Sequence, residues 1–293
     1  MLEKTTDLVV IGGGAAGMPA ALEAMEQGVP SVILLDKNPV PGGNARMAGG
    51  YLFAADSYTQ EEAGTVLHRE DAYREAMRYN HGHNVNPRIL RAFIDRSADN
   101  LAWLRTKGIE YFDTQFMGNG IVGAGAPGSY ARVIDKLKED FVALGGEVLG
   151  STPAKEILLD DSGAVRGVFA QDRNGEEVLI HTKYVILSPG GFMGNAELMA
   201  RYFSDQYDEK AYVTDAIRYA GDGISIAEKI GAKLSSSATL VKESGYCFAN
   251  QRNRPHRVSM MPGAVWINAE GRRFCDESTG NDHNNPNLLV QQP

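Results

Sequence analysis

The chain has 293 residues, 23% of them charged and 43% hydrophobic, which is typical of a globular protein of about two domains. Its formal net charge of −8 argues against sequence-independent nucleic-acid binding, which needs a basic face. No apolar run approaches the ~18 residues of a membrane-spanning helix, so we expect no membrane insertion. Two distant cysteines favour a reduced, cytoplasmic setting.

The N-terminal segment 7–36 predicts a βαβ unit that binds a dinucleotide, because two apolar runs flank a glycine-rich turn and a helical pattern. Gly12 allows the tight turn, Gly14 lets the backbone approach a pyrophosphate, and Gly17 lets the helix pack closely on the sheet. The helix N-terminus directs its unpaired N–H groups at the phosphates. Asp36 can accept hydrogen bonds from a ribose 2′-hydroxyl and would repel a 2′-phosphate, which argues against NADP.

Further elements follow in chain order. A glycine-paired loop over 37–50 is too irregular for a strand, and the charged stretch 60–80 is expected to be helical. A helix over 87–104 opens on a proline and carries its apolar residues on one face. Similar patterns predict helices over 130–144, which two glycines end, and over 221–231.

Residues 147–187 change character and alternate short β-rich runs with turns. The turns 160–163 and 172–175 combine Asp or Asn with Gly, as in tight hairpins, so an antiparallel meander is predicted to interrupt a parallel sheet. The run 184–187 is expected to return as a buried strand. Periodicity weakens beyond about residue 240, where we place the start of a second domain.

Five glycine-bearing segments occur in one order: the N-terminal turn, 42–44, 49–50, 190–192 and 221–223. Further on, Trp266 to Glu277 fits an Asn-x-x-Gly-x-Arg-Phe-x-(Asn/Asp)-Glu pattern. Together these motifs resemble the flavoprotein family of fumarate reductases, succinate dehydrogenases and 3-ketosteroid dehydrogenases, over essentially the whole chain.

This resemblance implies an α/β fold in two parts. Residues 1–240 are expected to form a doubly wound, Rossmann-like FAD-binding domain with an antiparallel β-meander insertion. Residues 241–293 are expected to form a partial α+β capping domain that binds substrate. In the family the capping domain returns to the flavin domain, whereas this chain ends at Pro293 without that return. We therefore expect a C-terminally truncated form.

The resemblance also implies FAD as the cofactor. By analogy, Asp36 holds the adenosine ribose, Ala154 borders the adenine, and Asp222 lies by the flavin or its ribityl chain. The residues expected to bind FAD are Gly12, Gly14, Ala16, Gly17, Asp36, Lys37, Gly43, Asn44, Ala45, Gly49, Gly50, Ala154, Gly190, Gly191 and Asp222. Several family members carry a histidine bonded to the flavin in the loop that corresponds to 44–48. This chain has none there, so we expect non-covalent FAD. An ordinary surface loop is the competing interpretation of 42–50.

For catalysis, the resemblance implies hydride transfer between flavin N5 and an activated C=C or CH–CH bond. The arginine that donates a proton in fumarate reductases corresponds to Asn281, which cannot deliver a proton at neutral pH. The Thr-Glu pair that grips a dicarboxylate falls on His256 and Arg257, so we do not expect a standard fumarate reductase. The candidate catalytic residues are Asn281, Arg257, His256 and His283, with a histidine as proton donor. The segment 252–257, with three arginines and a histidine, indicates a clamp for an anion or carbonyl group. A solvated loop with salt bridges is the competing interpretation of this segment.

The function predicted is therefore an FAD-dependent oxidoreductase of enoate-reductase type, acting on a small unsaturated acid or ketone. No second dinucleotide fingerprint is present, so an electron-donor protein or small carrier is expected instead of direct NAD(P)H reduction. The alternatives are a truncated or degenerate flavin-binding protein without turnover, and a 3-ketosteroid dehydrogenase-like enzyme. No metal site is expected, because His81 and His83 lack carboxylate neighbours at ligand spacing.

Overall fold

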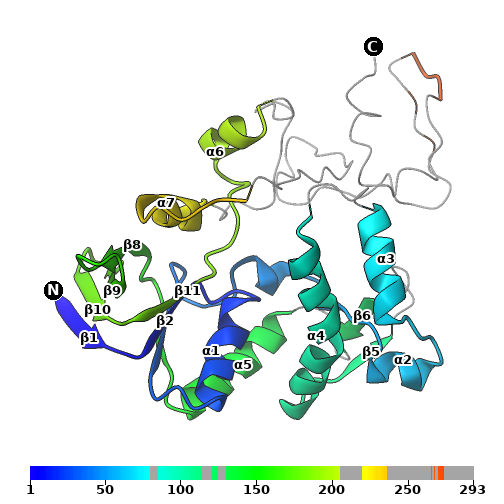
Figure 1. Cartoon of the computed structure of the whole chain (residues 1–293), viewed down its shortest axis with the longest axis horizontal. Helices are drawn as coiled ribbons and strands as arrows, with labels where there is room; N and C mark the ends of the chain where they lie inside the picture. The colour runs from blue at the N-terminus through cyan, green and yellow to red at the C-terminus, as the bar shows by residue number, and fades with distance from the viewer. Residues whose placement is uncertain are drawn as a thin grey trace.

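The computed structural model describes residues 1–79, 85–113, 121–124, 130–204, 220–235, 265, 267 and 270–273. These residues form a mixed α/β fold of three sheets and surrounding helices (Figure 1). The helices are α1 (Gly17–Glu26), the 3-10 helix η1 (Gly43–Met47), α2 (Tyr58–Ala63), α3 (Arg69–Tyr79), α4 (Pro87–Thr106), α5 (Ala131–Ala143), α6 (Ala196–Tyr202) and α7 (Asp222–Lys229).

A parallel sheet lies at the centre of the described residues. Its strands, in spatial order, are β11 (Tyr184–Leu187), β2 (Leu8–Ile11), β3 (Val32–Leu35) and β7 (Glu147–Leu149). β2 and β3 consist of Leu, Val and Ile and are buried along their whole length, as is typical of parallel strands covered on both faces. The carboxyl ends of these strands meet at one edge, where open α/β sheets bind their ligands.

The two faces of this sheet are covered differently. On one face, Leu34 lies in a buried cluster with Met18 of α1 and Ile134 of α5, two helices that pack together (Figure 1). On the other face, Ile33 clusters with an antiparallel sheet and with Ile226 of α7. The doubly wound arrangement, with helices on both faces, is therefore not confirmed, because a sheet covers most of the second face.

This mostly antiparallel sheet contains the predicted meander. Its strands, in spatial order, are β1 (Leu2–Thr5), β10 (Glu177–His181), β9 (Val165–Gln171) and β8 (Ala154–Leu159). β1 pairs with β10 in parallel, and the other two pairs are antiparallel. In the two hairpin turns, Asp160 and Asp172 accept hydrogen bonds from backbone N–H groups, while Gly163 and Gly175 adopt φ of 84° and 83°. In chain order the meander lies between β7 and β11, so it interrupts the strands of the parallel sheet as predicted. In space, β8, β9 and β10 pair with one another and, together with β1, form a separate sheet.

β11 corrects another expectation, because it is not a buried strand. Tyr184 is 68% exposed, and Ile186 and Leu187 are each 36% exposed. Among the described residues β11 pairs only with β2, so it is the outer strand of the sheet, and its other edge has no partner strand among these residues.

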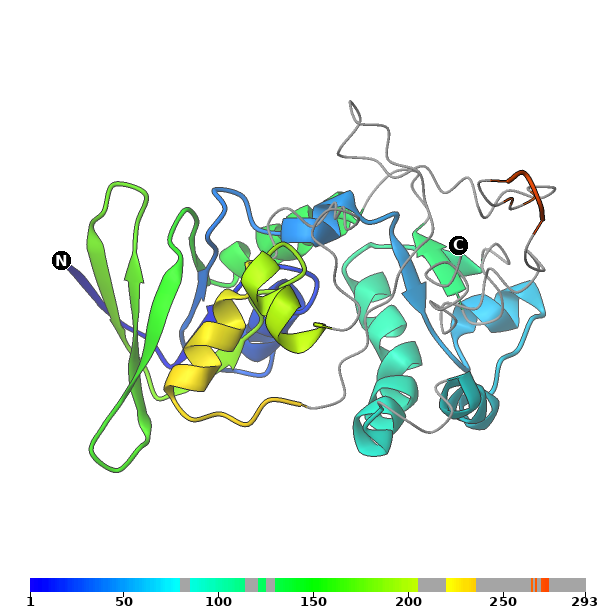
Figure 2. The same ribbon diagram turned by 90° about the horizontal axis from the view of Figure 1, so that it is seen from above.

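A third sheet and the helices beside it form the other end of the molecule. The antiparallel strands are β4 (Tyr51–Phe53), β6 (Ile121–Ala124) and β5 (Tyr111–Asp113). Figures 1 and 2 show this sheet with α2, α3 and α4 opposite the meander, with the parallel sheet between them. The sequence patterns do not indicate these strands, because three or four residues give too few alternations for a reliable period.

The helices expected from amphipathic patterns are present as α4, α5 and α7. Asn86 caps α4 by accepting hydrogen bonds from the first backbone N–H groups, and Pro87 occupies the first helical position, where proline fits. α5 ends just before Gly145, whose φ is 92°. One residue of the predicted apolar face of α4 departs from the pattern, since Phe93 is 54% exposed and stacks on Phe53.

Residues beyond 235 are described only at a few positions, where an antiparallel bridge joins Ile267 and Arg273. The division at residue 240/241 therefore stays a prediction. In the part of the chain that the structure describes, no helix is long and apolar enough to cross a membrane. The same residues contain no group of His, Cys, Asp and Glu that could hold a metal ion.

Candidate functional site

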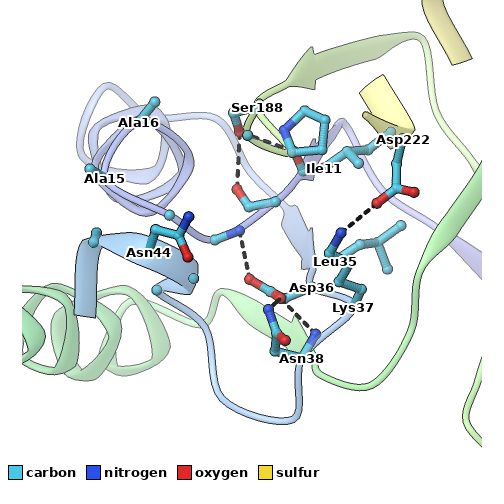
Figure 3. A pocket seen from close by; sticks show the side chains of 18 of the residues that line it. Ile11, Ala15, Ala16, Leu35, Asp36, Lys37, Asn38, Asn44, Ser188 and Asp222 are labelled. Carbon is cyan, nitrogen blue, oxygen red and sulfur yellow. Dashed lines mark hydrogen bonds and ion pairs between the residues drawn. The ribbon is translucent and has the colours of Figure 1, made fainter. Parts of the chain in front are cut away.

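A cavity of about 560 Å³ opens at the carboxyl edge of the parallel strands (Figure 3). Residues from 12–16, 36–38 and 42–48 line one side, which we call the first wall. Residues from 187–190 and 222–226 line the other side, the second wall. The remaining lining residues are Ile11, Leu35, Pro153 and Ala154.

The glycine turn after β2 brings the two walls together. Gly12 has φ of 96°, and a Cβ there would lie 2.3 Å from the carbonyl oxygen of Ser188, so only glycine fits. At Gly17 a Cβ would lie 1.8 Å from the carbonyl oxygen of Gly12, which explains how α1 starts so close to the strand. At Gly14 the nearest described atom is the carbonyl oxygen of Gly42, 3.8 Å away, so this backbone is open to a ligand.

Ala15 and Ala16, which directly precede α1, line the cavity at the N-terminus of this helix (Figure 3). No side chain of the described residues caps α1. The first N–H groups of a helix have no partner within the helix, and the positive end of the helix dipole attracts anions. This corner of the cavity therefore offers hydrogen-bond donors and a positive potential, the environment that a pyrophosphate needs.

Asp36, at the end of β3, places a buried carboxylate in the same cavity. Its side chain is only 5% exposed. Oδ2 accepts a hydrogen bond from the Gly13 N–H at 3.0 Å, and Oδ1 accepts from the Asn38 N–H at 2.8 Å and from the Asn38 side-chain amide at 3.1 Å (Figure 3). A carboxylate can accept about four hydrogen bonds, so acceptor capacity remains for a ligand hydroxyl.

The segment 42–48 completes the first wall and is fixed to α5. Arg46 donates two hydrogen bonds to Asp135, at 2.6 and 3.0 Å. The bond from Arg46 holds the pKa of the Asp135 carboxyl below its ordinary value, although partial burial opposes the shift. Asn44 and Ala45 belong to the same 3-10 helix as Arg46, so this pair holds them at the cavity.

The second wall comes from distant parts of the chain. Ser188 Oγ lies 3.0 Å from the carbonyl oxygens of both Ile11 and Gly12, which ties the end of β11 to the glycine turn. At the N-terminus of α7, the Asp222 carboxylate accepts a hydrogen bond from Lys37 Nζ at 2.7 Å. Figure 3 shows both contacts joining residues of the two walls.

Most residues predicted to bind the cofactor line this one cavity: Gly12, Gly14, Ala16, Asp36, Lys37, Gly43, Asn44, Ala45, Ala154, Gly190 and Asp222. Four do not line it: Gly17, Gly49, Gly50 and Gly191. Gly17 lies in the helix–strand contact, and Gly49 and Gly50 follow the lining residue Ala48. The contact that each of these residues makes with a cofactor stays a prediction.

Sequence reasoning missed two polar residues of the cavity, Asn38 and Ser188. Asn38 lies two residues after Asp36, a spacing at which a carboxylate commonly accepts a backbone N–H. Ser188 directly follows a predicted parallel strand, and the ends of neighbouring parallel strands meet at one edge. The sequence position of each residue could have indicated a place in the site, but placing Ser188 also requires the knowledge that β11 is the neighbour of β2.

The four candidate catalytic residues, His256, Arg257, Asn281 and His283, lie outside the described residues. His81 and His83 lie outside them as well. The structure therefore describes the cavity that most of the predicted cofactor-binding residues line, and the predicted catalytic roles stay predictions.

A family model described as an FAD binding domain matches residues 7–288. The vinyl phenol reductase of Lactiplantibacillus plantarum is 32% identical over 93% of this chain and 56% of its own length. A fumarate reductase (cytochrome) of Shewanella frigidimarina is 29% identical over 98% of this chain and 50% of its own length. The open conformation of a flavocytochrome c3 fumarate reductase superposes with a TM-score of 0.83 at 26% identity, over 99% of this chain and 51% of that one. The chain thus spans about half the length of these relatives.

Proposed function

The chain belongs to the FAD binding domain family, and from this premise we propose that the protein is an FAD-dependent oxidoreductase that reduces an activated C=C bond. One observation carries the proposal. A chain whose glycine-rich turn lines a cavity of about 560 Å³ matches, over nearly its whole length, relatives named for the reduction of fumarate and of vinyl phenol. Both names denote compounds with a C=C bond.

The cavity residues suit FAD in a definite orientation. We propose that the uncapped start of α1 binds the pyrophosphate and that Asp36 accepts hydrogen bonds from the adenosine ribose. Ala154 would then border the adenine, and the segment 42–50 would run beside the flavin. Because 44–48 contains no histidine, we propose that the FAD is held without a covalent bond.

When bound, FAD supplies hydride transfer to one carbon of the substrate C=C bond. The chain must then supply a proton to the adjacent carbon and stabilise the negative charge on the activating group. We propose that His256 or His283 donates the proton, that Arg257 stabilises the charge, and that Asn281 donates a hydrogen bond.

We propose a small unsaturated acid or ketone as the substrate, with one activating group. The positions that would grip a dicarboxylate carry His256 and Arg257 in place of a Thr-Glu pair, which disfavours fumarate itself. We further propose an electron-donor protein as partner and a cytoplasmic setting. Residues 241–293 would form a substrate-binding capping domain.

The first experiment is an absorbance spectrum of the purified protein before and after acid precipitation. We expect flavin bands that move into the supernatant. Flavin retained in the pellet would contradict non-covalent binding, and a colourless protein that took up no FAD would contradict the cofactor proposal for this chain.

Turnover is measured next, as oxidation of reduced methyl viologen with acrylate, crotonate, 4-vinylphenol or fumarate. We expect faster oxidation with at least one singly activated compound than with fumarate. His256→Gln and His283→Gln test the proton donor. His68→Gln is the matched control, since His68 is exposed and pairs with Asp56 away from the cavity. Bound flavin with no turnover of any compound would favour a flavin-binding protein without catalysis.

A further inference from the structure

We propose that the Lys37–Asp222 ion pair is a clasp that closes the cavity over the Asp36 end of bound FAD and slows both FAD uptake and FAD release. The proposal rests on the FAD binding proposed above. It assigns the pair a kinetic role in addition to any direct contact that either residue makes with the cofactor.

The two residues lie on opposite sides of the cavity. Lys37 follows Asp36 in the first wall, and Asp222 begins α7 in the second wall. They are 185 residues apart in the chain, and Nζ lies 2.7 Å from Oδ2 (Figure 3). A ligand that leaves between these two walls must pass the pair or separate it.

Burial places the pair at the rim. The Lys37 and Asp222 side chains are 29% and 41% exposed, although both line the cavity. Side chains that line a cavity and also reach solvent lie at its opening. Ser188 joins the same two walls at a second point, through carbonyl oxygens of Ile11 and Gly12 at the end of β2.

The two walls are held less firmly at the ion pair than at Ser188. The Ser188 contact directly follows the strand pairing between β11 and β2. α7 contacts the meander through the Lys229–Glu156 ion pair at 3.0 Å and through Ile226. An exposed ion pair contributes up to about 1 kcal/mol, enough to shift an opening equilibrium by roughly fivefold without fixing the wall permanently.

Asp222 is also held in place without Lys37. It occupies the first turn of α7, where a negative charge is favourable at the positive end of the helix. Gly223 packs against Pro189, since a Cβ there would lie 2.5 Å from the proline ring. Removing the lysine therefore leaves the carboxylate where it was and removes only the link between the walls.

The test compares FAD exchange in wild type, Lys37→Met, Asp222→Asn and the double variant, followed by flavin fluorescence in stopped flow. Each single variant is expected to speed both uptake and release by about threefold, and the double variant to match the singles. Added salt should speed release in wild type more than in the variants, because salt screens the pair.

Glu156→Gln is the matched control. It removes the Lys229–Glu156 ion pair between α7 and the meander, away from the cavity lining, and should leave both rates unchanged. Equal acceleration in this control would assign the effect to loosening of α7 and overturn the clasp. If the accelerations of the two single variants multiply in the double variant, or if release becomes faster while uptake is unchanged, the two residues make separate contacts with FAD. Either result would also overturn the clasp.

The outcome separates the clasp from the function it rests on. A protein that takes up no FAD overturns both proposals. FAD that binds and exchanges at the same rate in every variant overturns the clasp alone, whereas FAD exchange as expected with no substrate turnover overturns the reductase proposal alone.

Discussion

The two walls of the cavity are built in different ways. The first wall comes from three segments of one βαβ unit and the loop after it, 12–16, 36–38 and 42–48, whose shape is set by glycines without room for a Cβ and by hydrogen bonds to Asp36. The second wall comes from 187–226 and reaches the cavity only because β11 pairs with β2. Local sequence thus specifies one half of the cavity, whereas the order of the strands in the sheet determines the position of the other half.

The largest loss of stability is expected from a substitution at the point where the two walls touch. Gly12→Ala should lower the free energy of unfolding by about 3 kcal/mol, because it combines positive φ with a Cβ 2.3 Å from the Ser188 carbonyl oxygen. Gly28→Ala is the control. Its φ of 88° is similar but no atom lies within 4 Å of the added Cβ, so about 1 kcal/mol is expected. Equal losses in urea unfolding would show that φ alone matters.

Within the first wall, Asp36→Ala should cost about 2 kcal/mol of stability without cofactor, because the Gly13 N–H is left buried without its acceptor. FAD affinity should also fall at least about tenfold, through the lost bonds to the ribose. Asp36→Asn, which keeps one carbonyl oxygen, should lose less stability and less FAD affinity than Asp36→Ala. Asp161→Ala, at an exposed turn, controls for the change in net charge. Affinity equal to wild type in Asp36→Ala would contradict the proposed ribose contact.

A smaller effect is expected for the contact that fixes 42–48. Arg46→Met should cost about 0.5 kcal/mol after solvent screening and weaken FAD binding roughly twofold. Because Arg46 lowers the pKa of Asp135, this contribution is complete above the ordinary carboxyl pKa near 4 and is lost as the pH falls through the lower folded value. Urea midpoints of wild type and variant should therefore differ at pH 7 and converge toward pH 3. A constant difference would point to lost packing instead of lost charge.

The smallest change in stability is expected at the contact between α6 and α7, outside the cavity lining. Glu228 accepts hydrogen bonds from Arg201 at 2.9 Å and from Tyr202 Oη at 3.1 Å, which joins α6 to α7. Glu228→Gln should change stability by about 0.3 kcal/mol and leave FAD affinity the same, because the pair is exposed and lies away from the cavity. An affinity loss comparable to that of Asp36→Ala would show that the second wall depends on α6.

The sequence predicted the elements whose signals are local. Gly12, Gly14 and Asp36 follow apolar strands at fixed spacing. The hairpin turns carry Gly where φ is positive and Asp where backbone N–H groups need an acceptor. It did not predict that the meander forms a separate sheet or that β11 is exposed, because both depend on which strands pair. Ser188 was missed for the same reason, although its position after a strand was visible.

Asp36 has a consequence for how a cofactor binds. Its carboxylate is already oriented by the Gly13 and Asn38 donors before any ligand arrives, so the rotamer entropy of this side chain is lost during folding and not during association. Under the proposed ribose contact, the same atoms would serve folding and recognition. Exchange of this residue would then change the affinity for adenosine and the stability of the apoprotein together.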